Sequence, residues 1–335
     1  MTKETNTNLA LCIPTYNGAE KLKKSLPLWI EKLSPYGIPI YISNNASTDE
    51  TEQIVKEFQR QYEFIFYETN ETNIGPDKNF EKVLGMPDTE YRWLMGDDDK
   101  LVEGEINLLL DVLQKSYDAV VLNALFPITY KESIVYTNAD KALFDLGAMC
   151  TFMSILIFNK RLVESATFKE CYSSEFSELK FCHLAALFSC LANDNSNLFF
   201  CSDMYIVNFP SDKPIPWADK AFDYFCNKLS RTMQLLPDYY SKRSKLECPK
   251  KIKTQCWNWK AYICYAVMAK IAGKFNVRFY RESKANIKNI FSFGDRIVLF
   301  LLALSPRFVV KCIWYSLKFG KKVIKNLFGK QRKSD

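Results

Sequence analysis

The first hundred residues decide the fold, and they open with residues 9–18, LALCIPTYNG. The apolar run LALCI stops at Pro14, which is typical of a buried strand that ends in a loop. The loop is followed by large apolar residues at spacings of four, three and four, which share one helical face: Leu22, Leu26, Trp29 and Leu33. The sequence therefore begins with a predicted strand, a loop and an amphipathic helix.

This alternation of strand and helix continues through residue 95. Further strands are expected at three apolar runs: 39–43 (PIYIS), 63–67 (EFIFY) and 91–95 (YRWLM). Helices are expected between them, one capped by Thr48 and running through Gln61, the other over Asp77–Leu84. The alternation favours an α/β fold with a mostly parallel sheet that has helices on both faces.

The remainder of the chain gives further strand signals and then only helical ones. Strands are expected at residues 119–124, 134–137, 154–158 and 202–209, and helices from near Glu103 and at residues 179–191, 219–236, 251–272 and 285–291. We predict three parts: a main α/β domain over residues 1–215, a helical annex over 216–295, and a basic amphipathic tail over 296–335.

The 335 residues carry a net charge of +7, but the two ends of the chain differ in sign. Cys248–Asp335 holds 20 lysines and arginines against three acidic residues, whereas Met1–Glu247 holds 25 against 35. Lysines and apolar residues of the tail fall on opposite faces of a predicted helix: Lys311, Lys318, Lys322 and Lys325 on one, Ile313, Leu317, Ile324 and Leu327 on the other. We expect this helix to lie on an anionic membrane surface. The alternatives are a core-packing helix with a solvated lysine face and a nucleic-acid-binding tail.

Several classes of protein are disfavoured by what the sequence lacks. The eleven cysteines form no CxxC pair and the first residues, MTKETNTN, are polar, so we expect reduced thiols in a cytosolic compartment. His183 is the only histidine and no GxSxG motif accompanies it, which disfavours a structural zinc site and a Ser-His-Asp hydrolase. No apolar run reaches the ~20 residues that span a bilayer.

Four polar clusters follow the predicted strands, at the ends where parallel sheets bind ligands. They are PTYN (14–17), SNNASTD (43–49), NIGPDKN (73–79) and GDDD (96–99). Three adjacent carboxylates repel one another unless a cation lies among them. Because Mg²⁺ and Mn²⁺ prefer such oxygen ligands, we expect one of these metals at the acidic cluster, where it would neutralise a phosphate group. The alternative is a solvated acidic turn.

These four motifs, in this order, resemble glycosyltransferase family 2, whose members have the GT-A fold and invert the donor's anomeric centre. The segments LMGDDDKL (94–101) and SILIFNKRL (154–162) are most similar to the subgroup that builds O-antigen and capsular polysaccharide, including abequosyltransferase-like proteins. The resemblance covers about residues 8–210. It implies that residues 1–215 are a GT-A domain that binds a nucleotide-sugar and carries the catalytic residues.

The resemblance also implies roles for individual residues. Those implied for the nucleotide-sugar site are Pro14, Thr15, Tyr16, Asn44, Lys78, Asn79, Asp97 and Asp98. The first three would form the wall for the nucleobase and ribose, and Asn44 stands where the family usually has the Asp that reads the base. Lys78 and Asn79 would lie beside the diphosphate, and Asp97 near the ribose. Asp99 matches the acid that binds the metal and bridges it to the diphosphate.

Inversion requires a general base that deprotonates the acceptor hydroxyl. The family usually supplies it from a Glu-Asp or Asp pair at the start of a later helix, and this chain lacks that pair. In its place stand Glu178, Glu175 and His183, in that order of preference. Their alternative roles are structural, with Glu175 compensating charge at a helix N-terminus and His183 packing in the core.

We therefore expect an enzyme attached peripherally to the cytoplasmic face of the membrane, which moves a sugar, from a UDP-sugar in preference to a CDP-sugar, to a lipid-linked glycan. Its expected partners are a nucleotide-sugar donor, that lipid-linked acceptor and an anionic membrane surface, without nucleic acid. Two other functions stay open. A sugar nucleotidyltransferase also uses an acidic metal site, but it would open with a Gly-rich, basic phosphate loop where this chain has Thr-Tyr-Asn-Gly. A nucleic-acid-binding protein would explain the basic tail and leave the acidic cluster without a role.

Overall fold

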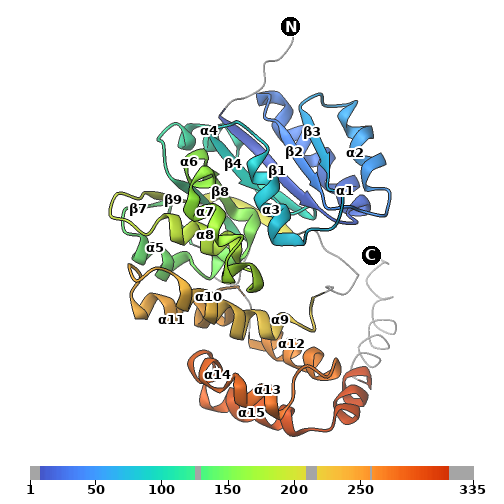
Figure 1. The fold of residues 1–335 in the computed structure, drawn as a ribbon, viewed down its shortest axis with the longest axis vertical. Helices are drawn as coiled ribbons and strands as arrows, with labels where there is room; N and C mark the ends of the chain where they lie inside the picture. Colours follow the sequence, from blue (N-terminus) through green and yellow to red (C-terminus); the bar gives the residue numbers. More distant parts are fainter. Residues whose placement is uncertain (1–7, 125–129, 209–216, 257–258, 317–335) are drawn as a thin grey trace, which may run out of the picture. The chain divides into compact units, whose positions relative to one another are not determined.

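The structure is a computed structural model, and it describes residues 8–124, 130–208, 217–256 and 259–316 (Figure 1). The chain divides into two compact units. The first contains residues 1–212 and 228–256, and the second contains residues 213–227 and 257–335. Residues 228–256, which the sequence analysis groups with the helical annex, therefore pack in the same unit as the sheet.

The first unit is built on a mixed sheet of nine strands (Figure 1). Eight of them run in the order β3-β2-β1-β4-β8-β6-β9-β5, and β7 pairs with β9. Strands β1 to β4 are parallel to one another, whereas β8 is antiparallel to β4. The strands are β1 Leu9–Thr15, β2 Ile40–Asn44, β3 Ile65–Thr69, β4 Tyr91–Leu94, β5 Asp99–Glu103, β6 Ala119–Ala124, β7 Ile134–Tyr136, β8 Leu156–Asn159 and β9 Leu198–Asn208. The predicted α/β class is confirmed.

Helices pack on this sheet through the apolar faces that the sequence indicates. Every residue of β1 and β4 is buried, as expected for parallel strands covered on both faces. The four apolar residues of the first helix are buried, and Trp29 meets Trp93 edge-on with ring centroids 5.2 Å apart. The helices of this unit are α1 Ala19–Leu33, α2 Thr51–Gln59, α3 Pro76–Gly85, α4 Ile106–Leu113, α5 Ala139–Leu146, α6 Lys160–Glu164, α7 Ala166–Cys171, α8 Cys182–Cys190, α10 Leu229–Leu235 and α11 Lys242–Lys251.

One predicted helix start is wrong because a distant residue decides the local structure, and another is shifted by a strand that was not predicted. Thr48 does not cap α2, because its N–H donates to Asn17 Oδ1 and the helix begins at Thr51. The helix expected from near Glu103 is α4, which begins at Ile106 because residues 99–103 pair with β9 as an antiparallel strand. Helix α5 was not predicted at all.

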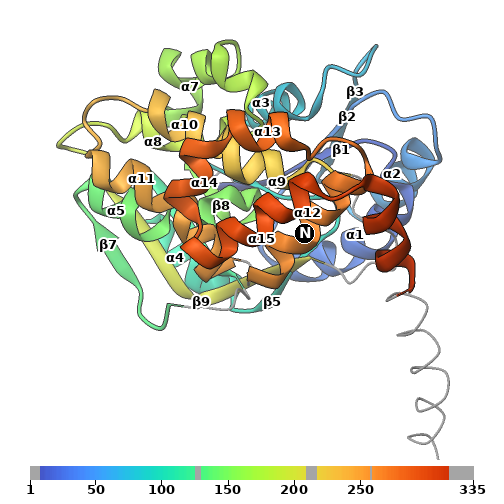
Figure 2. The ribbon, with the colours of Figure 1, turned by 90° about the horizontal axis from the view of Figure 1, so that it is seen from below.

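The described part of the second unit is helical (Figure 2). Aromatic side chains meet in its core. Its helices are α9 Ala221–Asp223, α12 Trp259–Ile271, α13 Val277–Glu282, α14 Lys284–Ile290 and α15 Phe293–Leu304. Phe222 lies within 6 Å of three rings, those of Tyr262 (5.6 Å), Phe275 (5.1 Å) and Phe291 (5.8 Å). Edge-to-face and stacked contacts of this kind stabilise the core beyond the apolar area that the rings bury.

The chain leaves α15 through a bend and continues as a helical segment, Arg307–Ser316. Among the described residues no single helix has the length and apolar composition needed to cross a membrane. In the described part of the chain, one pair of helices, α15 and Arg307–Ser316, meets that requirement when taken together, and the pair is bent by 111°. The part of the predicted amphipathic tail that lies beyond residue 316, including its lysines at 318, 322 and 325, falls outside the described residues.

Candidate active site

The carboxyl ends of β1, β2 and β4 lie at one edge of the sheet, because these strands are parallel and adjacent. The Thr15 hydroxyl, at the end of β1, donates a 2.7 Å hydrogen bond to Asp97 Oδ2 in the loop after β4. Gly18 permits this approach, since a Cβ there would lie 2.1 Å from Thr15 Oγ1 and 2.5 Å from Asp97 Oδ2. The structure thus brings the first and the last of the four polar clusters together.

The second cluster is joined to the first across the ends of β1 and β2. The Asn17 N–H donates to Ser47 Oγ over 2.8 Å, and the Thr48 N–H donates to Asn17 Oδ1 over 2.8 Å. Burial acts to raise the pKa of Asp49, but hydrogen bonds, among them those from Thr51, outweigh it and hold that pKa below its ordinary value. Asp49 is therefore ionised, and its carboxylate accepts hydrogen bonds that hold the loop and the start of α2 in place.

Four asparagines form a network that joins the second and third clusters. Asn45 Nδ2 donates to Asn73 Oδ1, and Asn70 Nδ2 donates to both Asn45 Oδ1 and Asn79 Oδ1, each over 3.0 Å. Asn79 Nδ2 in turn donates to the Ser43 carbonyl over 2.9 Å. Asn79 is only 2% exposed, so its amide supports the loop that leads into α3 and does not face solvent.

Lys21, which the sequence analysis did not single out, extends from α1 over the acidic cluster. Its Nζ lies 2.9 Å from Asp97 Oδ1 and 3.2 Å from Asp98 Oδ2. Burial acts to lower the pKa of Lys21, but the two carboxylates outweigh it and raise that pKa. Burial raises the pKa of Asp97 despite the neighbouring ammonium. The chain thus supplies its own cation to part of the acidic cluster.

Asp99 is enclosed by side chains that the sequence places far away. Its carboxylate accepts short hydrogen bonds from the Ser154 hydroxyl and from Asn208 Nδ2. Only 2% of Asp99 is exposed, and burial raises its pKa to about 8 although the bond from Ser154 acts to lower it. Both oxygens of this carboxyl group therefore already accept hydrogen bonds within the protein.

A divalent metal fits the acidic cluster if the donor supplies part of its coordination. Within residues 8–124, 130–208, 217–256 and 259–316, no group of three or more His, Cys, Asp or Glu side chains is arranged to hold an ion. Mg²⁺ and Mn²⁺ require less, because they keep water ligands and bind substrate phosphates beside one or two carboxylates. The side chain of Asp98 is 43% exposed and meets that requirement, whereas the carboxylate of Asp99 is enclosed.

The other residues predicted for the donor site differ in solvent exposure and in their hydrogen-bond partners. Pro14 is buried in β1, and Tyr16 is 49% exposed in the loop that follows. Asn44 is buried, with its Nδ2 donating to Tyr67 Oη over 2.7 Å and its Oδ1 accepting from the Ser47 N–H. Lys78 forms an ion pair of 2.9 Å with a glutamate one turn further along α3.

The three residues predicted as general bases have different surroundings. Glu175 accepts two hydrogen bonds from the Arg231 guanidinium, of 2.7 and 3.1 Å, which lower its pKa. Glu178, one helical turn later, is exposed, and no hydrogen bond or ion pair joins its carboxylate to another described residue. His183 is 4% exposed, and its Nε2 lies 3.3 Å from the Thr151 carbonyl. Burial lowers the pKa of His183, so its imidazole is neutral.

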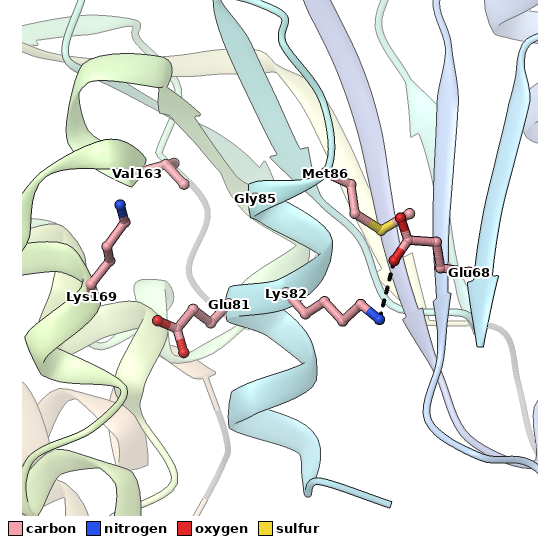
Figure 3. A pocket seen from close by; sticks show the side chains of 7 residues that line it. All are labelled: Glu68, Glu81, Lys82, Gly85, Met86, Val163 and Lys169. Carbon is pink, nitrogen blue, oxygen red and sulfur yellow. Dashed lines mark ion pairs between the residues drawn. The ribbon is translucent and has the colours of Figure 1, made fainter. Parts of the chain in front are cut away.

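A separate hollow of about 440 Å³ lies beside the C-terminal half of α3 (Figure 3). It is lined by Glu68, Glu81, Lys82, Gly85, Met86, Val163 and Lys169, none of which is a predicted site residue. Glu68 and Lys82 form an ion pair of 3.1 Å on one side of the helix, while Glu81 and Lys169 lie on the other (Figure 3). The hollow adjoins the third cluster, because Glu81 pairs with Lys78 over 2.9 Å and Lys82 Nζ donates to Asn70 Oδ1 over 2.8 Å, but its lining carries charges of both signs and includes no predicted site residue.

Comparison with known proteins identifies a family match near the start of the chain. Residues 10–143 match the model of glycosyl transferase family 2, and this segment includes all four polar clusters. The chain carries a family 2 glycosyltransferase domain. It is 36% identical over 112 residues to the abequosyltransferase RfbV of Salmonella typhimurium, a match that covers 33% of this chain and 34% of that protein.

A second curated relative belongs to the same functional class. The GalNAc(5)-diNAcBac-PP-undecaprenol beta-1,3-glucosyltransferase of Campylobacter jejuni is 27% identical over 118 residues, which cover 35% of this chain and 38% of the relative. The chain thus matches a little over a third of the length of these relatives. The sequence similarity therefore covers only part of each protein.

Solved structures extend the similarity in fold to most of the chain. TarS of S. aureus (residues 1–349) aligns with a TM-score of 0.51 at 15% identity, covering 88% of this chain and 81% of that one. A mannosyltransferase of Pyrobaculum calidifontis, solved with GDP-Man and Mn²⁺, aligns with a TM-score of 0.51 at 12% identity, covering 98% and 92%. At such identities these structures show the fold, which is the GT-A type that the sequence predicts.

Proposed function

We propose that this chain is a glycosyltransferase that moves a sugar from a nucleotide-sugar donor to a lipid-linked glycan during the synthesis of a surface polysaccharide. The observation that carries the proposal is the hydrogen bond between Thr15 and Asp97, which joins two motifs of the family domain across 82 residues of sequence. The named relatives support the acceptor class, because one is an abequosyltransferase and the other acts on a glycan linked to undecaprenyl diphosphate.

For the donor, we propose that the nucleoside diphosphate binds along the ends of β1, β2 and β4. Tyr16 is exposed there and offers a ring to the nucleobase, while Thr15 and Asp97 lie beside one another for the ribose, as the resemblance implies. The enclosed amides of Asn44 and Asn79 act by holding these loops in place. We keep the preference for a UDP-sugar, which rests on the resemblance alone.

For the metal, we propose Asp98 as the carboxylate that faces the ion, in place of Asp99 as the sequence analysis predicts. Asp98 exposes oxygen to solvent, whereas the oxygens of Asp99 are enclosed and bonded to Ser154 and Asn208. When bound, a divalent ion stabilises the negative charge of the departing nucleoside diphosphate. Lys21 lies at the same carboxylate and contributes a second positive charge to this region.

For the acceptor, we propose Glu178 as the general base. It takes the proton of the acceptor hydroxyl as that oxygen bonds to the anomeric carbon and the bond between that carbon and the diphosphate oxygen breaks. Glu175 is a weaker base, because the Arg231 guanidinium holds its lone pairs and lowers its pKa. His183 is neutral but enclosed, so it lacks access to an acceptor hydroxyl.

A panel of nucleotide-sugars, incubated with the protein and Mn²⁺, tests the proposal, because glycosyltransferases of this kind often hydrolyse their donor slowly. We expect one UDP-sugar to be hydrolysed, EDTA to stop the reaction, and Asp98→Asn to lower the rate by about 10²-fold or more, since several kcal/mol of charge stabilisation is lost. Hydrolysis that persists undiminished in EDTA would refute the metal, and no hydrolysis or binding of any nucleotide-sugar would refute the function.

A second comparison identifies the base. Glu178→Gln is expected to lower transfer by about 10²–10⁴-fold while leaving the affinity for the donor unchanged. Glu175→Gln is the matched control, because it removes a carboxylate from the same turn that is engaged with Arg231. Equal rates in the two variants would show that the base lies elsewhere.

A further inference from the structure

The second unit presents an apolar surface that its own fold leaves uncovered. Ten large apolar side chains between residues 293 and 315 are each at least 36% exposed. Six of them lie on α15: Phe293, Ile297, Val298, Phe300, Leu301 and Leu304. The other four lie on Arg307–Ser316 and include Phe308, which is 70% exposed. We call these ten side chains the docking surface, and their concentration on one stretch of chain marks an interaction site.

The docking surface belongs to a well-defined helix. Ser292 and Asp295 form a capping box at the start of α15. Leu299 and Ala303 of the same helix are buried, so one face of α15 packs in the unit while the opposite apolar face is exposed. Lys270 Nζ donates to the Ala303 carbonyl over 2.8 Å and fixes the far end of the helix. The exposed face is therefore held in position and is not the product of a frayed terminus.

The segment after α15 widens this surface. Arg307–Ser316 turns away from α15 by 111°. The Arg307 guanidinium donates over 2.6 Å to the Ile271 carbonyl at the end of α12, which holds the start of the segment against the unit. Two short helices joined at such an angle cover a broad, shallow area, which suits insertion into one leaflet of a bilayer.

The positive charge of the sequence that contains the docking surface favours anionic lipid over a second copy of the chain as its partner. Residues 284–316 contain five lysines and arginines against one aspartate, and residues 317–335 add seven against one. Lys288 and Lys311 are exposed in this region. A second copy of the chain, placed on the same surface by twofold symmetry, would bring these like charges together. Anionic lipid headgroups instead attract each lysine or arginine while the acyl chains take up the apolar side chains.

We propose that the docking surface seats the second unit in an anionic lipid bilayer, with the exposed faces of α15 and Arg307–Ser316 at the level of the acyl chains. The proposed function enters only as the reason for membrane contact, which would bring the enzyme to a lipid-linked acceptor in the same bilayer. It places the main apolar contact on α15 and Arg307–Ser316, whereas the sequence analysis predicts it for the apolar face of the tail helix.

Co-sedimentation of the full chain with vesicles tests this proposal. Vesicles of pure phosphatidylglycerol are expected to bind the wild-type chain, and vesicles of pure phosphatidylcholine to bind it more weakly. Leu301→Glu combined with Phe308→Glu should weaken binding to phosphatidylglycerol at least tenfold, because each change places a charge where roughly a full apolar side chain was buried. The matched control is Leu28→Glu combined with Leu108→Glu, two leucines that are 37% and 40% exposed on helices of the first unit. Equal binding of the two double variants would overturn the proposal.

Thiol labelling locates the contact without any change to the apolar side chains. Cys312 and Cys264 are both exposed, and Cys312 lies within the segment that carries the docking surface. Phosphatidylglycerol vesicles should slow maleimide labelling of Cys312 more than that of Cys264, and equal slowing would contradict the proposed contact. Donor hydrolysis, measured without vesicles, should be unchanged in Leu301→Glu with Phe308→Glu, which separates failure of this surface from failure of the catalytic site. A wild-type dimer that the same double variant converts to a monomer, with vesicle binding intact, would assign the surface to a second copy.

Discussion

Replacing Lys21 by methionine tests the arrangement of charge at the acidic cluster. The ammonium of Lys21 contacts Asp97 Oδ1 at 2.9 Å and Asp98 Oδ2 at 3.2 Å, so it occupies the carboxylate that we propose for the metal. Methionine keeps the length of the side chain and removes the charge. We expect Mn²⁺ to bind more tightly to the nucleotide-free variant than to the wild-type protein, because the ion no longer competes with an ammonium for Asp98.

The expected change in Mn²⁺ affinity follows from how far the side chains of Lys21 and Asp98 are exposed to solvent. The side chains of Lys21 and Asp98 are 47% and 43% exposed, and ion pairs at such positions contribute about 0.2–1 kcal/mol. Removing that competition should tighten Mn²⁺ binding up to about fivefold. The contact with Asp97 is different, since Asp97 is buried, and its loss should lower the free energy of unfolding by about 1–3 kcal/mol.

Titration calorimetry with Mn²⁺ and urea unfolding in EDTA measure the two effects separately. Lys24→Met is the matched control, because Lys24 is an exposed lysine of the same helix. Mn²⁺ affinity in Lys21→Met that equals or falls below that of the control would refute the competition. An unchanged free energy of unfolding would refute the contact between Lys21 and Asp97.

Three further predictions concern titration, thiol reactivity and donor choice. Burial lowers the pKa of His183 below the ordinary 6.5, so the unfolded chain binds a proton at this histidine more readily than the folded chain. The free energy of unfolding should therefore fall as the pH drops through about 6.5. Urea unfolding at pH 5 and 7 should show this fall in the wild-type chain and a smaller one in His183→Gln. Of the eleven cysteines, Cys264 and Cys312 are exposed, and burial raises the pKa of the Cys171 thiol to about 11. Two thiols should therefore react rapidly with Ellman's reagent and nine slowly. More than two rapidly reacting thiols would contradict the packing. UDP should compete for the donor site more strongly than GDP, and tighter binding of GDP would refute a pyrimidine pocket.

The sequence predicts the first half of the fold because its signals are local. Each of the first four strands is a short apolar run, and the four apolar residues of α1 share one face, so pattern alone is sufficient there. The family domain covers the same region, residues 10–143. Helix α5 also carried a local signal that the sequence analysis missed, since Asn138 caps it by accepting from the Lys141 N–H.

The remaining errors come from contacts between residues far apart in sequence. Strand β5 exists because Asp99 pairs with Asn208 of β9, and no pattern within residues 99–103 indicates that partner. Ser154 donates to Asp99 across 55 residues, and Lys21 reaches Asp97 across 76. The sequence therefore indicates which carboxylates gather at the acidic cluster. Their separate surroundings, with Asp97 and Asp99 buried and Asp98 exposed, follow only from the packed structure.

The binding of UDP tests the central claim most directly, because the claim is that the nucleotide binds at the carboxyl edge of the sheet. Calorimetry should detect UDP binding to the wild-type chain, a loss of at least tenfold in affinity in Asp97→Asn, and no change in Lys169→Met, which alters the hollow beside α3. Thermal unfolding of each variant checks that the fold is kept. Unchanged UDP binding in Asp97→Asn together with lost binding in Lys169→Met would place the nucleotide in the hollow and contradict the account.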